Sequence, residues 1–383
     1  MPKNECGQGL CGEPARIQRL PDFARNRSEA AFVLAVSGSC AVKYQASMLA
    51  ATAMLLATRP AYETVVMLAD ECAGDAALAA RIAGLGARPL PLPHLQNVSC
   101  RGPKYAQGLH LEVQLNATEA KRKGGNYFEA TYTKLRAWGL TRFRAVLSID
   151  NDVAVLRNLD GLLDTMLLNN DEVRELRTPQ GCLPQKDAHS YLNTGLWGLR
   201  PSGLLWEGMY RELRRGRFSC GVGDQTAAMQ YFGDDRRLNK RGTRSSQTMS
   251  LHAGYNLKAN IGAISCLSKL QRLRVGPGNH SADDLAKNGA DDAQLMKAPR
   301  VLHLVDPGGS DLNLQVRELA AHAHAIHWSG SRKPATLVPG TVRDPIERRA
   351  LSLYMREYSR VMKELQADKA GGAGPLAAFG GLS

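Results

Sequence analysis

Hydrophobic and polar positions alternate in blocks along the first 90 residues. Two short runs are continuously apolar, AFVLAV at 31–36 and TVVMLA at 64–69, which is typical of strands covered on both faces. Residues 45–58, rich in Ala, Leu and Met, predict a helix between them. A short Ala-rich helix capped by Asp75 then precedes a third strand near Leu90. This order of strands and helices predicts a parallel, Rossmann-like α/β sheet.

The same patterns divide the chain into four parts. The expected parts are an irregular N-terminal arm (1–28), one α/β domain (29–340), a helical C-terminal extension (341–368) and a disordered, Gly-rich tail (369–383).

Within the α/β domain, a helix is expected at 134–140 and a buried strand, AVLSI, at 145–149. Polar stretches at 233–248 and 276–292 predict surface inserts, and the polar stretch at 94–126 predicts a long surface loop or a flap near a site.

Composition narrows the class of protein. Of 383 residues, 44% are hydrophobic and 22% are charged, which is typical of a globular chain with a core of its own. Lys and Arg number 49 against 36 Asp and Glu, a net charge of +13, which favours a polyanionic partner. Nucleic acid, an anionic membrane surface or a phosphorylated small molecule would each satisfy that charge.

Targeting signals are absent from the sequence as it stands. It holds no apolar run of about 18 residues, so no transmembrane segment is expected, and its first residues lack the apolar core of a secretory signal. The expected compartment is therefore the cytoplasm, with the eight cysteines as free thiols. Four N-x-S/T sequons occur, at Asn26, Asn97, Asn116 and Asn279. They instead favour the Golgi lumen, if an N-terminal signal anchor is missing from this chain.

The sequence SIDND carries the first candidate chemistry. Asp150 and Asp152 follow a buried strand, at the end where α/β sheets bind ligands, and residues two apart on a strand share a face. Both carboxylates can thus meet one divalent cation held by diphosphate oxygens. An exposed acidic turn is the alternative. Aspartyl-phosphate phosphohydrolases also carry D-x-D, but with Thr or Val where this chain has Ala154, and near the start of their domain.

Five further blocks surround this motif. In chain order they are TYTKLRAW (131–138), YLNTGLWGLRPS (191–202), GVGDQTAAMQYF (221–232), LHAGYNLKANI (251–261) and IHWSGSRKP (326–334). In this order and spacing the chain resembles the glycogenin-like and galactinol-synthase-like members of glycosyltransferase family 8. With the strand at 31–36, the resemblance covers about 300 residues. It implies a single GT-A domain with a mixed, mainly parallel central sheet.

The resemblance also implies a reaction and a set of residues. The reaction is transfer of a hexosyl or pentosyl group from a UDP-sugar, with retention of configuration and with Mn²⁺ or Mg²⁺ as cofactor. The metal ligands it implies are Asp150, Asp152 and His327. The donor-binding residues it implies are Ala35, Ser37, Tyr44, Lys134, Asp150, Asn151, Asp152, Gly330 and Lys333. The catalytic residues it implies are Asn193, Asp224 and Gln225.

Several of these residues have a plainer interpretation. His327 can be a hydrogen-bonded histidine at a strand end, and His303 is a second candidate for the metal histidine, although no G-x-x-K-P follows it. Asp224 and Gln225 can simply cap the helix that begins there. Asp160 and Asp164 are expected to face solvent or to cap a helix.

The acceptor is expected to be a separate molecule, namely a glycan, lipid, polyol or protein. Glycogenin glucosylates its own tyrosine, whereas YNLKANIGAISC has no tyrosine after Asn256. A homodimer is one expected assembly. The alternative function is a catalytically inactive basic module that binds nucleotide-sugar or nucleic acid. Nucleic acid is the less expected partner, because only 22 residues are Phe, Trp or Tyr and stacking platforms are few.

Overall fold

The structure of the chain is a computed structural model. It describes residues 18–36, 40–93, 95, 98, 131–169, 175–179, 192–218, 223–232, 248–250, 257–258, 323–328, 334–337 and 345–371.

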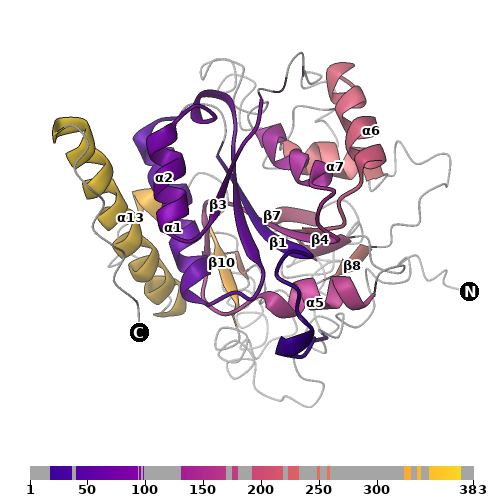
Figure 1. The fold of residues 1–383 in the computed structure, drawn as a ribbon, viewed down its shortest axis with the longest axis horizontal. Coiled ribbons are helices and arrows are strands. Elements are labelled where there is room, and N and C mark those ends of the chain that lie inside the picture. Colours follow the sequence, from indigo (N-terminus) through magenta and orange to yellow (C-terminus); the bar gives the residue numbers. More distant parts are fainter. Residues whose placement is uncertain are drawn as a thin grey trace, which may run out of the picture.

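A seven-stranded sheet forms the centre of the described part, in the order β3-β2-β1-β4-β7-β6-β8 (Figure 1). Its strands are β1 (Ala30–Val36), β2 (Glu63–Leu68), β3 (Arg88–Pro91), β4 (Ala145–Ile149), β6 (Glu175–Pro179), β7 (Leu192–Leu199) and β8 (Thr248–Ser250). Strands β3, β2, β1 and β4 pair in parallel, and β7 is antiparallel to both of its neighbours. The prediction of a mixed, mainly parallel α/β sheet is confirmed.

A second, three-stranded sheet has the order β5-β10-β9. Its strands are β5 (Val153–Val155), β9 (Leu257–Lys258) and β10 (Ala325–His327). Strand β10 runs antiparallel to β5 and parallel to β9. Because β5 begins four residues after β4 ends, this small sheet adjoins the carboxyl end of the central one.

Helices cover both faces of the central sheet. The apolar side chains of β1 alternate, so that Phe32 and Leu34 pack on one face and Ala31 and Val33 on the other. The first face is covered by α1 (Val42–Ala57), α2 (Ala76–Gly84), α5 (Asp160–Leu168) and α13 (Pro345–Gly371). The second is covered by η4 (Tyr132–Gly139), α6 (Gly203–Arg214) and α7 (Asp224–Phe232). Two-sided burial explains the continuously apolar strands.

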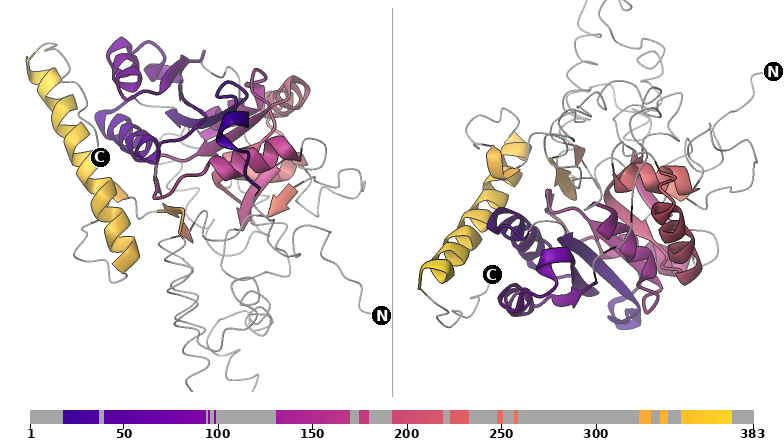
Figure 2. Two further views of the ribbon diagram at one scale, coloured as in Figure 1. Left: turned by 60° about the horizontal axis from the view of Figure 1, so that its bottom comes forward. Right: turned by 90° about the horizontal axis from the view of Figure 1, so that it is seen from above.

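The C-terminal helix α13 lies along α1 on the outside of the first face (Figure 2). It buries one stripe of side chains, formed by Ala350, Leu351, Tyr354, Val361 and Leu365. This is the amphipathic helix that the sequence predicts, and it continues to Gly371, beyond the expected boundary at 368. None of the helices in the described ranges is long and apolar enough to cross a membrane.

Local predictions hold to within a few residues. The strand at 145–149 is confirmed, and Asp75 caps α2 by accepting a hydrogen bond from the Leu78 N–H at 2.8 Å. The expected helix at 134–140 is a 3₁₀ helix, η4, that begins at Tyr132. Over eight residues, periods of 3.0 and 3.6 cannot be told apart from sequence alone.

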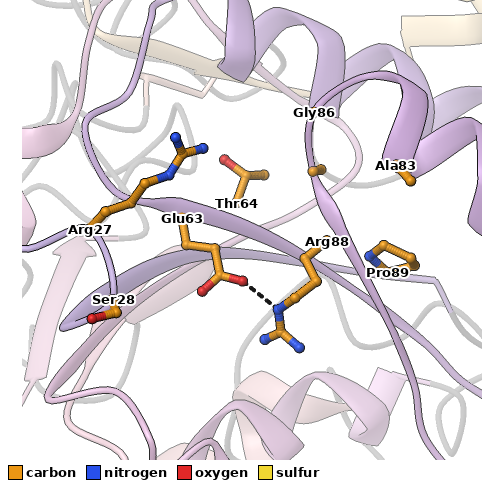
Figure 3. Close-up of a pocket in the computed structure, with 9 residues that line it drawn as sticks. Arg27, Ser28, Glu63, Thr64, Ala83, Gly86, Arg88 and Pro89 are labelled. Atoms are coloured by element: carbon orange, nitrogen blue, oxygen red, sulfur yellow. Dashed lines mark hydrogen bonds and ion pairs between the residues drawn. The ribbon is translucent and has the colours of Figure 1, made fainter.

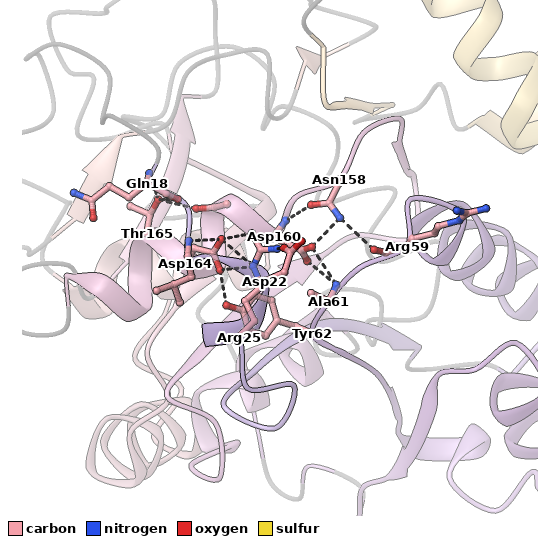
Figure 4. Close-up of polar contacts among 12 residues, drawn as sticks. Gln18, Asp22, Arg25, Arg59, Ala61, Tyr62, Asn158, Asp160, Asp164 and Thr165 are labelled. Carbon is pink, nitrogen blue, oxygen red and sulfur yellow. Dashed lines mark hydrogen bonds and ion pairs between the residues drawn. The ribbon is translucent and has the colours of Figure 1, made fainter.

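A polar cluster ties the N-terminal segment to α5 (Figure 4). The Asp164 carboxylate is fully buried and accepts hydrogen bonds from the Arg25 guanidinium at 2.7 Å, the Leu20 N–H at 3.0 Å and the Tyr62 hydroxyl. Asp160, also buried, accepts from the Ala61 N–H at 3.1 Å. The expectation that Asp160 and Asp164 face solvent or cap a helix is therefore wrong, because both carboxylates are buried and accept hydrogen bonds from segments about 100 residues or more away.

A disulfide joins Cys40 to Cys72, with Cα atoms 5.1 Å apart. The expectation that every cysteine is a free thiol is therefore wrong. Parallel strands β1 and β2 leave the sheet at the same edge, so the loops that follow them meet although the cysteines are 32 residues apart. The other six cysteines lie outside the described residues.

We expect Arg25→Met to lower the free energy of unfolding by about 3–5 kcal/mol, because it leaves the buried Asp164 carboxylate without its cation. Urea denaturation followed by circular dichroism measures the change. Arg27→Met, on the same segment but exposed, is the matched control and should change stability by less than about 0.5 kcal/mol. Equal stability of the two variants would contradict the assignment.

We expect the double variant Cys40→Ala/Cys72→Ala to lose about 3–4 kcal/mol of stability, the chain-entropy value for a crosslink that closes about 32 residues. Urea denaturation under non-reducing conditions measures it, and dithiothreitol should destabilise the wild type similarly. A peptide map of the non-reduced protein tests the pairing directly, and detection of Cys40 and Cys72 as unlinked peptides would refute it.

Candidate metal and diphosphate site

Residues Asp150, Asn151 and Asp152 form a turn, the D-N-D turn, at the carboxyl end of β4, where the loops that follow the parallel strands lie. Asp150 follows the last residue of β4, and Asp152 precedes the first residue of β5. The Asp150 N–H donates to the Gly195 carbonyl of β7 at 2.9 Å. Side chains of Asp150 and Asp152 are 33% and 14% exposed, so a ligand can reach both.

Strand β10 brings His327 to this turn. His327 pairs with Val153 in the antiparallel β5–β10 ladder, which places its ring beside Asp152, with 3.4 Å between Nε2 and Oδ1. One ligand atom each from Asp150, Asp152 and His327 lies within 4.8 Å of the others. Two carboxylates and an imidazole suit Mn²⁺, and a set rich in carboxylate also accepts Mg²⁺. The three residues therefore fit a divalent cation.

Lys134, from η4, supplies a buried positive charge. Its ammonium donates to Asp150 Oδ1 at 2.6 Å and to the Thr194 carbonyl, and lies 3.6 Å from Asp224 Oδ2. Burial opposes the charged form, but the carboxylates of Asp150 and Asp224 outweigh it and raise the pKa of Lys134. The lysine therefore stays protonated and fixes the orientation of Asp150.

Asp224 is a third carboxylate, buried behind the D-N-D turn. It is the first residue of α7, its N–H donates to Thr131 Oγ1 at 3.1 Å, and its Oδ2 accepts from Thr194 Oγ1 at 2.9 Å. Burial raises the pKa of Asp224, and the charge of Lys134 opposes that rise. Its contacts with Thr194 and Lys134 show that it does more than begin a helix.

Asn193 and Gln225 lie together beside this carboxylate. Asn193 Nδ2 donates to Gln225 Oε1 at 3.3 Å, and Asn193 Oδ1 accepts from the Gly195 N–H at 2.8 Å. The structure thus brings Asn193, Asp224 and Gln225 into one group, from β7 and α7.

Gly195, in β7, lies directly against the His327 ring. A Cβ atom on this residue would lie 2.2 Å from His327 Cε1, 2.4 Å from His327 Nδ1 and 2.7 Å from Asn193 Oδ1. These separations are far below van der Waals contact, so only glycine leaves room for the imidazole.

The other expected donor residues are placed as follows. The carbonyl of Ala35, at the end of β1, accepts from Asn151 Nδ2 at 2.8 Å, so β1 holds the D-N-D turn. Tyr44, on α1, is 42% exposed, with the Lys43 ammonium 4.9 Å above its ring. Three expected residues, Ser37, Gly330 and Lys333, lie outside the described ranges. The alternative histidine, His303, also lies outside them.

A cavity of about 550 Å³ lies at the opposite edge of the sheet (Figure 3). Arg27, Glu63, Thr64 and Arg88 line it, at the amino ends of β1, β2 and β3, and Glu63 is ion-paired with Arg88. The carboxylate cluster lies at the carboxyl ends, so this cavity is separate from the candidate site.

The sequence interpretation missed Thr131, Thr194 and Gly195. Each adjoins a residue that it selected: Thr194 and Gly195 follow Asn193 in the N-T-G triplet, and Thr131 opens the block that contains Lys134. The small size of residues 194 and 195 was the available signal, because a close approach of backbone to a site requires small side chains.

Comparisons with known proteins found structural likeness only. No protein-family model and no curated protein matches the sequence. The galactosyltransferase LgtC in complex with donor and acceptor sugar analogs is 13% identical, at a TM-score of 0.44 over 86% of this chain and 95% of that one. The bifunctional glycosyltransferase WbbM is 16% identical, at a TM-score of 0.47 over 88% and 52%. The glycosyltransferase GlyE of Streptococcus pneumoniae is 12% identical, at a TM-score of 0.45 over 90% and 64%. These values do not assign the chain to a family.

We expect Gly195→Ala to weaken Mn²⁺ binding by about 10- to 100-fold, because the new methyl group displaces the His327 ring. Titration of free Mn²⁺ by electron paramagnetic resonance measures this. Gly203→Ala is the matched control, since its Cβ would meet only Thr141 Cγ2 at 3.9 Å, an ordinary contact. Wild-type Mn²⁺ affinity in a folded Gly195→Ala variant would argue against His327 as a ligand.

Proposed function

We propose that this chain is a Mn²⁺-dependent glycosyltransferase of the family 8 type, with a GT-A domain. In this proposal it moves a hexosyl or pentosyl group from a UDP-sugar to a separate acceptor, with retention of configuration. The donor nucleotide, the identity of the metal and the retention of configuration follow from the sequence resemblance to that family. The chemistry of the carboxylate cluster supports transfer from a nucleoside diphosphate sugar more generally.

One observation carries the proposal. Asp150, Asp152 and His327 converge at the carboxyl ends of the parallel strands, although His327 is 175 residues from Asp152 in sequence. Ligands of α/β sheets bind at this edge. An exposed acidic turn would not recruit a distant, 3%-exposed histidine. The cluster therefore favours a metal site over that alternative.

Each described residue has a role in this proposal. Asp150, Asp152 and His327 would hold a divalent ion, which when bound stabilises the negative charge that develops on the departing nucleoside diphosphate. Lys134 fixes Asp150 and offsets the charge of the buried Asp224. Asn193, Asp224 and Gln225 present oxygen and amide groups next to the cluster, suited to positioning the transferred sugar.

The acceptor remains a proposal from the sequence. Because the chain lacks the tyrosine that glycogenin modifies on itself, the acceptor is a separate molecule in this proposal, namely a glycan, lipid, polyol or protein. The basic segments at 121–123 and 236–241, which favour an acidic acceptor or a membrane surface, lie outside the described residues.

Two observations favour the lumenal alternative for the compartment. A disulfide such as Cys40–Cys72 forms and persists in oxidising compartments. The sequon at Asn26 lies on an exposed segment, where the Asn26 side chain accepts a hydrogen bond from Ser28 Oγ at 2.8 Å. The disulfide and the exposed sequon both fit the Golgi lumen better than the cytoplasm.

We expect Asp152→Asn to lower Mn²⁺-dependent turnover of a UDP-sugar by at least about 100-fold, because a carboxylate ligand is replaced by a neutral amide. A panel of UDP-sugars with Mn²⁺, followed by UDP release, identifies the donor with the wild-type protein, and the variant is then compared on that donor. Thermal unfolding confirms that the variant is folded.

Asp22→Asn, whose side chain is 95% exposed, is the matched control and should retain full turnover. Undiminished turnover in Asp152→Asn would refute the metal-dependent mechanism. Mn²⁺ binding by the wild type without turnover of any UDP-sugar would instead support the inactive binding module.

A further inference from the structure

The D-N-D turn is held by hydrogen bonds with four other segments of the chain. The Asp150 N–H donates to the Gly195 carbonyl of β7, and Asn151 Nδ2 donates to the Ala35 carbonyl of β1. The Trp328 N–H, next to β10, donates to the Asp152 carbonyl at 3.1 Å. The fourth comes from the C-terminal helix α13, where the Tyr354 hydroxyl donates to the Asn151 carbonyl at 2.9 Å.

The Tyr354 hydroxyl is placed to make this bond. The residue is fully buried, and burial raises the pKa of its phenol, so the hydroxyl keeps its proton and can donate. A second carbonyl, that of Ser47 on α1, lies at 3.3 Å. Since a phenol has one hydrogen to donate, the shorter bond, to the D-N-D turn, is the better formed of the two.

The Tyr354 ring is fixed between two aromatic neighbours. It packs against Trp328 with ring centroids 5.8 Å apart, and it stacks on Tyr358 at 6.3 Å. Trp328 directly follows His327. A single side chain of α13 therefore touches both segments that carry the metal ligands, the D-N-D turn through its hydroxyl and the β10 segment through its ring.

The packing of α13 makes this reach possible. The helix lies along α1, which carries Ser47 (Figure 2), and Tyr354 belongs to the buried stripe of α13. Asn151 separates the two carboxylate ligands, so fixing its carbonyl restrains the peptide planes that set the directions of Asp150 and Asp152.

We propose that Tyr354 is a positioning residue for the metal site, and that α13 is an integral part of that site. This inference rests on the proposed function for the metal but not for the sugar donor. Tyr354 acts through the Asn151 carbonyl and the Trp328 ring, which orient Asp150, Asp152 and His327.

The test is the Mn²⁺ affinity of Tyr354→Phe without any donor, measured by electron paramagnetic resonance of free Mn²⁺. This change removes one oxygen atom and keeps the ring that packs on Trp328. We expect Mn²⁺ to bind about tenfold more weakly, the lower range for loss of a group that orients metal ligands. Hydrogen exchange at residues 151–154 should also become faster in the metal-free variant, a change independent of catalysis.

Tyr358→Phe is the matched control. It removes a hydroxyl from the neighbouring ring of the same helix, and no described contact links Tyr358 to the D-N-D turn, so its Mn²⁺ affinity should stay within about twofold of wild type. Equal Mn²⁺ affinity and equal exchange rates in Tyr354→Phe and Tyr358→Phe overturn the inference.

A second test uses the wild-type protein and does not require Tyr354→Phe to fold. If α13 positions the ligands, then Mn²⁺ binding must reciprocally stabilise α13, because coupling between two sites is symmetric in free energy. Slower hydrogen exchange around residues 351–358 on addition of Mn²⁺ supports the inference, and slower exchange at 150–154 alone overturns it.

Failure of this inference and failure of the proposed function have different signatures. Weaker Mn²⁺ binding in Tyr354→Phe, with no UDP-sugar turnover by the wild type, upholds the inference and refutes the transferase. Turnover by the wild type with unchanged Mn²⁺ affinity in Tyr354→Phe upholds the transferase and refutes the inference. Absence of Mn²⁺ binding by the wild type overturns both.

Discussion

The candidate site depends on the interaction of one buried ammonium with two carboxylates. The Lys134 ammonium contacts both Asp150 and Asp224, and leaving the buried Asp224 carboxylate without a compensating charge would cost several kcal/mol. The charge of the lysine offsets that cost. Its orientation is set in turn by the Thr194 carbonyl. The 3₁₀ helix η4, strand β7 and helix α7 therefore all contribute to the placement of the carboxylates.

This constraint explains why the elements meet as closely as they do. Strand β7 runs against the direction of its neighbours and presents the N-T-G triplet at the carboxyl end of β4. Asn193 there contacts Gln225, Thr194 contacts Asp224, and Gly195 makes room for His327. A larger residue at 195 would push the His327 ring away from the two carboxylates.

Both ends of the described chain support the same core from outside it. The N-terminal segment reaches α5 through Arg25 and the buried Asp164, and the C-terminal helix reaches the D-N-D turn through Tyr354. Neither segment belongs to the sheet, yet Arg25 donates to the buried Asp164 carboxylate and Tyr354 donates to the Asn151 carbonyl. A buried acceptor without a donor is costly, which gives a physical reason for both segments to remain docked.

The sequence alone determined the four parallel strands β1 to β4 and the helices α1, α2 and α13, because apolar periodicity reports which faces are buried. It also selected Asp150 and Asp152, since a D-x-D after a buried strand is a local pattern. Tertiary structure decided the rest. Asp160 and Asp164 look like surface carboxylates until donors from other segments bury them. Cys40 and Cys72 meet only because β1 and β2 are neighbours, and Tyr354 is one apolar position among several until α13 packs on α1. Each of these depends on contacts between residues from about 30 to 200 positions apart, which a local pattern does not encode.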